Sequence, residues 1–96
     1  MHTFLKSDEF DAWLTGLKDA VGKAVIAKRI RAAESGNLGD CEPVGEGVAE
    51  MRIHFGRGYR VYLAQRGLEV VVLLAGGDKS SQSKDIKRAL DLARRL

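Results

Sequence analysis

The sequence predicts a single α+β domain over residues 1–96, in which an antiparallel sheet is covered on one face by a helical hairpin. Two observations lead to this prediction. Apolar residues recur with helical spacing in three segments (10–17, 25–33 and 86–93) and at every second position between residues 49 and 64, as in strands. The strand-like segments also follow one another across short turns, which favours antiparallel pairing.

The N-terminal third is expected to hold a short strand and two helices. Residues 3–6 suit a strand, and Ser7 suits the N-cap of a helix with an acidic first turn. Residues 19–22 interrupt the pattern, so the second helix is expected to begin near Lys23 and to stop at Gly36 and Asn37. The inward stripes of the resulting hairpin would be Phe10, Trp13, Leu14 and Leu17, then Val25, Ile26, Ile30 and Ala33.

The remaining chain predicts three strands and a final helix. Residues 36–47 contain four glycines and the only proline and are expected to form one long loop. Strands follow over 49–55 and 59–64, joined by the turn Gly56-Arg57-Gly58, and the apolar segment 68–75 predicts a buried central strand. The last helix would be capped by Ser81, with Ile86, Ala89, Leu90 and Ala93 as its inner stripe, so the element order is β-α-α-β-β-β-α.

Composition excludes some classes of protein. An apolar fraction of 45% is enough for one modest core in a chain of 96 residues. No run of eighteen apolar residues occurs, so no membrane span is expected. The single cysteine, Cys41, cannot form an internal disulfide, which fits a reducing environment and predicts a cytoplasmic location.

Charge is unevenly distributed along the chain. Residues 1–50 contain six Lys and Arg against nine Asp and Glu, a net charge of −3, whereas residues 51–96 contain ten against four, a net charge of +6. A basic half of this kind suggests a surface that faces a polyanion. Nucleic acid, an anionic membrane and an acidic protein partner all remain open on this observation.

A cluster of polar residues is predicted on two neighbouring strands. If residues 56–58 form a three-residue loop, His54 lies opposite Arg60 and Arg52 lies opposite Tyr62, and such cross-strand neighbours have Cβ atoms about 5 Å apart. These four side chains would then share the uncovered face of the sheet, where Glu50 could neutralise one cation. Because adjacent cations repel each other, an anion is the expected ligand.

The segment after the buried strand extends this cluster. Gly76 and Gly77 would let the backbone turn sharply or approach a ligand closely, and Lys79 would then reach a phosphate from the rim. Neither the spacing of metal ligands nor the full phosphate-loop pattern is present, so no metal and no other cofactor is expected. Further basic residues expected to bind a phosphodiester are Arg57, Lys84, Lys87 and Arg88.

Five segments carry a resemblance to a known family. They are FDAWLTGLKD (10–19), IAKRIRAAESGNLGD (26–40), PVGEGVAEMRI (43–53), GYRVYL (58–63) and LLAGGDKSSQSKDIKRA (73–89). In order and spacing they resemble the toxins of type II toxin–antitoxin modules, in the phage-derived Gp49-like or HigB-like group of addiction module killer proteins within the RelE/ParE superfamily. The similarity runs over nearly the whole chain.

The resemblance implies a RelE-like fold and a function. RelE-like members cut mRNA without a metal, usually on the ribosome, by attack of the ribose 2′-hydroxyl on the adjacent phosphate. The implied partners are the ribosome, mRNA and a cognate HigA-like helix-turn-helix antitoxin, which blocks the toxin and alone contacts operator DNA. Two alternatives remain: a ParE-like toxin that binds and poisons DNA gyrase without catalysis, and a degenerate toxin kept as an antitoxin-binding module.

The resemblance also suggests roles for individual residues. Arg60 in GYRVY matches the family's strand arginine and would stabilise the transition state. Arg52 and Lys79 fall where related toxins place basic residues, and His54 and Tyr62 are candidates for proton transfer. Several relatives use a histidine or tyrosine near the C-terminus, but this chain has neither after Tyr62, so the general acid is left open. Arg57, Lys84, Lys87 and Arg88 would bind RNA.

Overall fold

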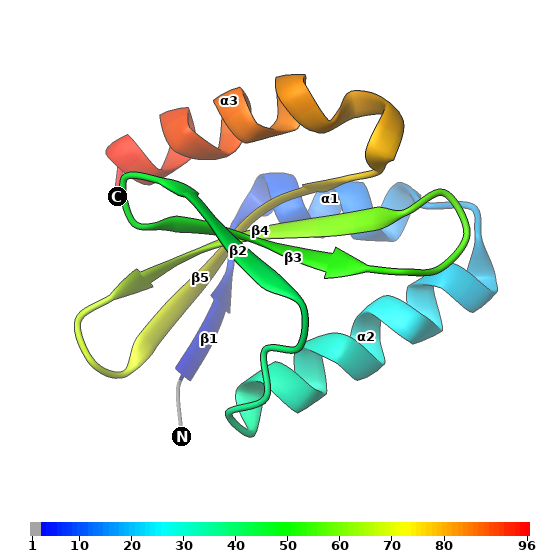
Figure 1. Ribbon diagram of the computed structural model, residues 1–96, viewed down its shortest axis with the longest axis horizontal. Helices are drawn as coiled ribbons and strands as arrows, with labels where there is room; N and C mark the ends of the chain where they lie inside the picture. Colours follow the sequence, from blue (N-terminus) through cyan, green and yellow to red (C-terminus); the bar gives the residue numbers. More distant parts are fainter. Residues whose placement is uncertain (1–2) are drawn as a thin grey trace.

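The computed structural model describes residues 3–96; residues 1 and 2, which the single-domain prediction includes, lie outside this range. The α+β class and the C-terminal helix are confirmed. Figure 1 shows the elements in chain order: β1 (Thr3–Lys6), α1 (Asp8–Gly16), α2 (Ala20–Glu34), β2 (Cys41–Gly45), β3 (Val48–Ile53), β4 (Tyr59–Arg66), β5 (Val70–Gly77), the 3₁₀ turn η1 (Lys79–Ser81) and α3 (Gln82–Arg94). Within residues 3–96 no helix is both long enough and apolar enough to cross a membrane.

The sheet has the strand order β1-β5-β4-β3-β2 and is mixed. Strands β2 to β5 pair in antiparallel fashion, as predicted, but β1 pairs with β5 in parallel, with Thr3 beside Val70. The prediction of a wholly antiparallel sheet is therefore wrong at one edge. A four-residue strand carries no local signal of its partner, which here lies almost seventy residues later in the chain.

The predicted long loop 36–47 is also wrong in part. Cys41–Gly45 forms the edge strand β2, paired with β3. Pro43 is tolerated there because an edge strand does not need every N–H for pairing. Glu46 and Gly47, both with positive φ, then reverse the chain into β3.

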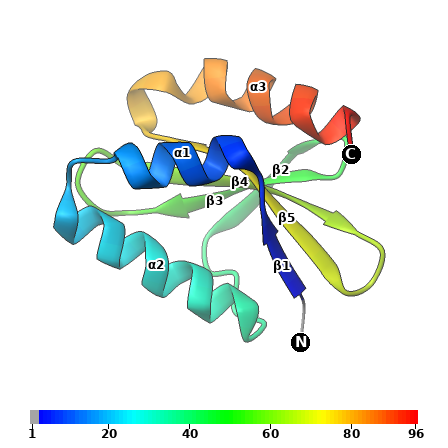
Figure 2. The same cartoon turned by 180° about the vertical axis from the view of Figure 1, so that it is seen from behind.

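Helices cover both faces of the sheet, as Figures 1 and 2 show. Helices α1 and α2 pack on one face, and α3 packs on the other, so the predicted uncovered face is wrong. The buried residues of the first layer are Phe10, Ile26, Ile30, Ala33, Met51, Ile53, Tyr59, Val61, Leu63, Val71 and Leu73. Those of the second are Val48, Tyr62, Ala64, Val72, Leu74, Ala75, Ala89 and Ala93.

Local signals locate the helix starts well. Ser7 is the N-cap of α1, with its Oγ accepting a hydrogen bond from the Phe10 N–H at 2.9 Å. The predicted break at residues 19–22 is instead the start of α2, because Asp19 is its N-cap and accepts from the Gly22 N–H at 2.9 Å. The Tyr59 hydroxyl also donates to Asp19 at 2.7 Å, which ties the helix start to β4.

The turn between β3 and β4 is longer than predicted. Ile53 pairs with Tyr59 and Arg52 with Arg60, so the turn contains residues 54–58 rather than three residues. The Gly58 N–H donates to the Phe55 carbonyl at 3.0 Å, and Gly56 and Gly58 have φ of 56° and 74°, which glycine adopts without strain. The predicted register between β3 and β4 is therefore wrong by two residues, because Arg52 pairs with Arg60 rather than with Tyr62. His54 lies beyond the end of β3.

Gly76 and Gly77 have a different role from the predicted turn. Both lie within β5, where a Cβ on Gly76 would enter the Trp13 ring and one on Gly77 would meet Asp85. The two glycines make room for α1 on one face and α3 on the other. Asp78 then caps η1 by accepting from the Ser80 N–H at 2.8 Å, whereas Ser81 precedes α3 as predicted but makes no side-chain cap bond.

Candidate functional site

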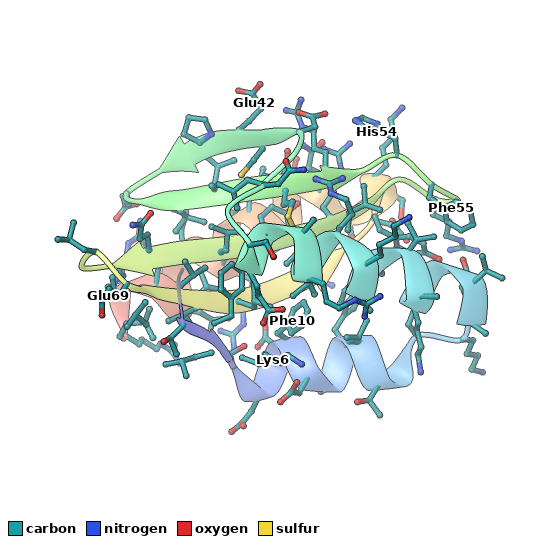
Figure 3. All side chains as sticks on the ribbon, turned by 90° about the horizontal axis from the view of Figure 1, so that it is seen from below. Lys6, Phe10, Glu42, His54, Phe55 and Glu69 are labelled. Atoms are coloured by element: carbon teal, nitrogen blue, oxygen red, sulfur yellow. The ribbon has the colours of Figure 1, made fainter. Side chains whose placement is uncertain are left out.

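A groove opens at one end of the sheet, where the β3–β4 turn meets the start of η1. The Lys79 N–H donates to the Arg57 carbonyl at 3.2 Å and joins the two segments. Figure 3 shows His54 and Phe55 at this end of the molecule. The structure thus brings together four of the predicted site residues in a lining made of His54, Phe55, Gly56, Arg57, Gly58, Arg60 and Lys79.

Beneath the groove, the buried carboxylate of Glu50 organises four side chains. Only 1% of the Glu50 side chain is exposed. Its Oε1 accepts from Arg60 Nη1 at 3.1 Å and from Arg52 Nε at 3.0 Å. Its Oε2 accepts from the Tyr62 hydroxyl at 3.0 Å and from Gln82 Nε2 at 2.9 Å. Glu50 therefore pairs with two arginines rather than the one expected, and it connects β3 and β4 to the first residue of α3.

These contacts determine the charge state of Glu50. Burial alone would raise its pKa, but hydrogen bonds from Gln82, Arg52 and Tyr62, together with the charge of Arg60, hold the pKa below its usual 4.5. The carboxylate is consequently ionised at neutral pH. Burial and the bond to Glu50 raise the pKa of Tyr62, so its phenol stays protonated.

Arg60 lines the groove while Glu50 holds it from below. Its side chain is 13% exposed, and Nη1 is engaged by the carboxylate. Within residues 3–96 the buried Arg60 Nε has no hydrogen-bond partner. The bond from Nη1 to Glu50 thus holds the guanidinium in position beside the groove.

His54 is oriented by an acid from the segment before β2. Its Nε2 lies 2.6 Å from Asp40 Oδ2, and 75% of the His54 side chain is exposed. The hydrogen bond from His54 lowers the pKa of Asp40, so this carboxylate accepts and Nε2–H donates. Within the part of the chain described, no hydrogen bond to Nδ1 is found, and in this tautomer Nδ1 is a hydrogen-bond acceptor.

Several predicted site residues do not reach the groove. Tyr62 is fully buried beneath α3, and Arg52 contacts Glu50 without lining the groove. Lys84 and Lys87 are exposed on α3. Arg88 forms ion pairs with Glu9 at 2.6 Å and with Asp91 at 3.1 Å. The pair with Glu9 links α3 to α1.

Sequence reasoning missed three residues of this region. Asp40 lay in the presumed loop, and Gln82 gave no signal of a buried partner. Phe55 was predicted to lie within the strand over 49–55, but β3 ends at Ile53 and Phe55 is 37% exposed. The glycines at 56 and 58 were the available sign of a wider turn. Within residues 3–96 no group of three or more His, Cys, Asp or Glu side chains could hold a metal ion.

Comparison with known proteins gives two matches. The family model described as phage-derived protein Gp49-like (DUF891) matches residues 12–96, a range that includes every residue lining the groove. An uncharacterized protein of Haemophilus influenzae is 51% identical over 87 residues, which cover 91% of this chain and 88% of that protein. No solved structure matches at a significant level.

Proposed function

The chain belongs to the phage-derived Gp49-like family, a RelE-like toxin family, and from this premise we propose that it is a ribosome-dependent endoribonuclease that cuts mRNA. Membership in a toxin–antitoxin family implies an antitoxin partner. We propose that this partner is a HigA-like helix-turn-helix protein that neutralises the toxin and carries the contacts to operator DNA. Arg60 provides the main support for the nuclease, because Glu50 holds it rigidly beside Arg57, Lys79 and His54.

The proposed reaction depends mainly on cations that stabilise negative charge in the transition state. The ribose 2′-hydroxyl loses its proton and attacks the adjacent phosphorus, the bond to the 5′-oxygen breaks as that oxygen takes up a proton from water, and a 2′,3′-cyclic phosphate and a 5′-hydroxyl result. Negative charge builds up on the phosphorane oxygens during this step. Arg60 and Lys79 would stabilise it, and cations that are already in position avoid reorganisation during the reaction.

Proton transfer is assigned to His54. With Nε2–H donated to Asp40, the imidazole presents Nδ1 as the acceptor for the proton of the 2′-hydroxyl. Asp40 then acts as a positioning residue that selects this tautomer. Tyr62 was predicted as a second candidate for proton transfer. Its role is instead to hold the Glu50 carboxylate, because its hydroxyl is buried and donates to Glu50.

The direct test is expression of the wild-type chain and of Arg60→Ala in bacteria. The wild type should arrest growth and truncate transcripts within coding regions, as read by sequencing RNA 5′ ends. Loss of one transition-state cation should slow cleavage by roughly 10²–10³-fold, so the host should tolerate Arg60→Ala. A matched control is Arg31→Ala, which changes an exposed arginine on α2 and should remain toxic.

One result would contradict this assignment. Intact transcripts together with accumulating gyrase-cleaved DNA would identify the chain as a gyrase-binding toxin, because RelE-like and ParE-like proteins share one fold and differ in the site.

A further inference from the structure

Phe55 is an aromatic side chain at the edge of a cationic groove. It is 37% exposed, whereas Phe10, Tyr59 and Tyr62 are between 0% and 3% exposed. A single exposed apolar residue is common on protein surfaces and by itself implies nothing. Phe55 differs from such a residue because it lines a groove whose other side chains are polar and basic.

The backbone that carries Phe55 is fixed on both sides. The Phe55 N–H donates to the Ile53 carbonyl at 2.8 Å, and the Gly58 N–H donates to the Phe55 carbonyl at 3.0 Å. The bond from Lys79 N–H to the Arg57 carbonyl then anchors the turn to η1. The neighbouring Gly56 has no side chain that could cover the ring. The turn therefore holds the backbone of Phe55 in place beside the groove that this residue lines.

The other side chains of the groove are polar and basic. Phe55 shares it with His54, Arg57, Arg60 and Lys79. A protein partner that buried the ring would also have to compensate these cations in a small area. Single-stranded nucleic acid meets both demands at once, because its phosphates bind cations while its bases stack on aromatic rings.

We propose that Phe55 forms a nucleobase subsite of the groove, in which a base next to the scissile phosphate stacks on the ring while Arg57 and Lys79 bind the backbone. This inference rests on the proposed endoribonuclease function and identifies the part of the substrate that the β3–β4 turn holds. Every base has a π-face, so the subsite orients the RNA without reading its sequence.

The test uses ribosomes programmed with an mRNA that carries a 2′-methoxy group at the cleavage position and 2-aminopurine beside it. The methoxy group removes the nucleophile, and stacking quenches the fluorescence of 2-aminopurine. Wild-type protein should bind and quench. Phe55→Tyr, which keeps a ring, should do the same, whereas Phe55→Leu should bind roughly tenfold more weakly and leave the fluorescence unquenched.

The matched control is Leu68→Ala. Leu68 is 88% exposed in the β4–β5 turn, which Figure 1 shows at the opposite end of the sheet from the β3–β4 turn, and its removal should change neither binding nor quenching. Thermal unfolding of Phe55→Leu should match that of the wild type, because the ring is partly exposed and lies outside the two buried layers.

Two results would overturn the inference and can be told apart. If Phe55→Leu binds and quenches like the wild type while Lys79→Ala binds weakly, the groove binds phosphate but has no base subsite. If the wild type neither binds these ribosomes nor cuts the mRNA with its 2′-hydroxyl restored, the proposed function fails and the subsite fails with it.

Discussion

Glu50 links the stability of the protein to its candidate site. It is buried on the face covered by α3, and each of its oxygens accepts two hydrogen bonds from side chains. A buried carboxylate is tolerated only when its charge and lone pairs are satisfied in this way. The same contacts allow two arginines to lie opposite each other on β3 and β4.

Replacing Glu50 by Gln should destabilise the protein by about 3 kcal/mol, the lower end of the range for breaking a buried ion pair, because Arg52 is partly exposed. Arg60 would then be buried without a compensating charge. Urea unfolding at pH 7 measures the change. Glu42→Gln, an exposed glutamate on the neighbouring edge strand, should alter stability by less than roughly 0.5 kcal/mol.

The effect of Glu50 should depend on pH in a defined direction. Folding lowers the pKa of Glu50, so the stabilisation from its charge is fully present above its usual pKa of 4.5 and is lost as the pH falls through the lower folded value. The difference between wild type and Glu50→Gln should therefore shrink in urea titrations carried from neutral to strongly acidic pH. A constant difference would show that the charge of Glu50 is not the stabilising feature.

At the scale of elements, the end of β5 is the point where the helical layers meet the sheet. Trp13 from α1 packs on Gly76. The centroid of its ring lies 5.9 Å from the ring centroid of Phe10 and 6.4 Å from that of Tyr59. On the opposite face, Gly77 leaves room for Asp85 of α3. Two adjacent residues without side chains thus let two helices approach one strand.

Gly76→Ala should destabilise the protein by about 1–3 kcal/mol, because the new methyl group displaces the Trp13 ring. Unfolding in urea tests this. The double variant Gly76→Ala with Trp13→Leu should lose less than the sum of the two single changes, since both act on one contact. Strict additivity would contradict the proposed clash. Gly16→Ala is the control, because within residues 3–96 no atom lies within 4 Å of a Cβ at that position in α1.

At the scale of the whole molecule, much of the basic C-terminal half is neutralised within the fold. Arg88 pairs with Glu9, Arg94 with Glu46 and Arg95 with Asp91. The excess of +6 over residues 51–96 is therefore not all directed at a ligand. Among the basic residues that line the groove, Arg57 and Lys79 have no ion pair within residues 3–96.

Binding of a non-cleavable single-stranded RNA should weaken with salt. The two unpaired groove cations, Arg57 and Lys79, on two phosphates predict a slope of about −1.4 in a plot of log affinity against log salt. Lys79→Ala should make the slope shallower by roughly 0.7. Arg88→Ala should leave it unchanged, because Arg88 is already paired with Glu9. Fluorescence anisotropy over a salt series gives these slopes, and a flat response in the wild type would exclude phosphate binding by the groove.

The features that sequence alone predicted are those determined over a few neighbouring residues. Ser7 caps α1, α2 ends just before Gly36, and alternating residues build β3 and β4, because a cap, a stop and a period depend on nearby atoms. The same periodicity placed Arg52, Arg60 and Tyr62 on one face of the sheet, and the structure agrees.

Tertiary structure alone decided the features that join distant segments. These are the parallel pairing of β1 with β5, the edge strand β2, the cover of α3 over Tyr62, and the contact of Asp40 with His54. The two-residue displacement of Arg52 and Arg60 from their expected partners belongs with them. Each depends on how separate elements pack and on how residues 54–58 close a turn, and the free energy of such contacts is not encoded in any short stretch of chain.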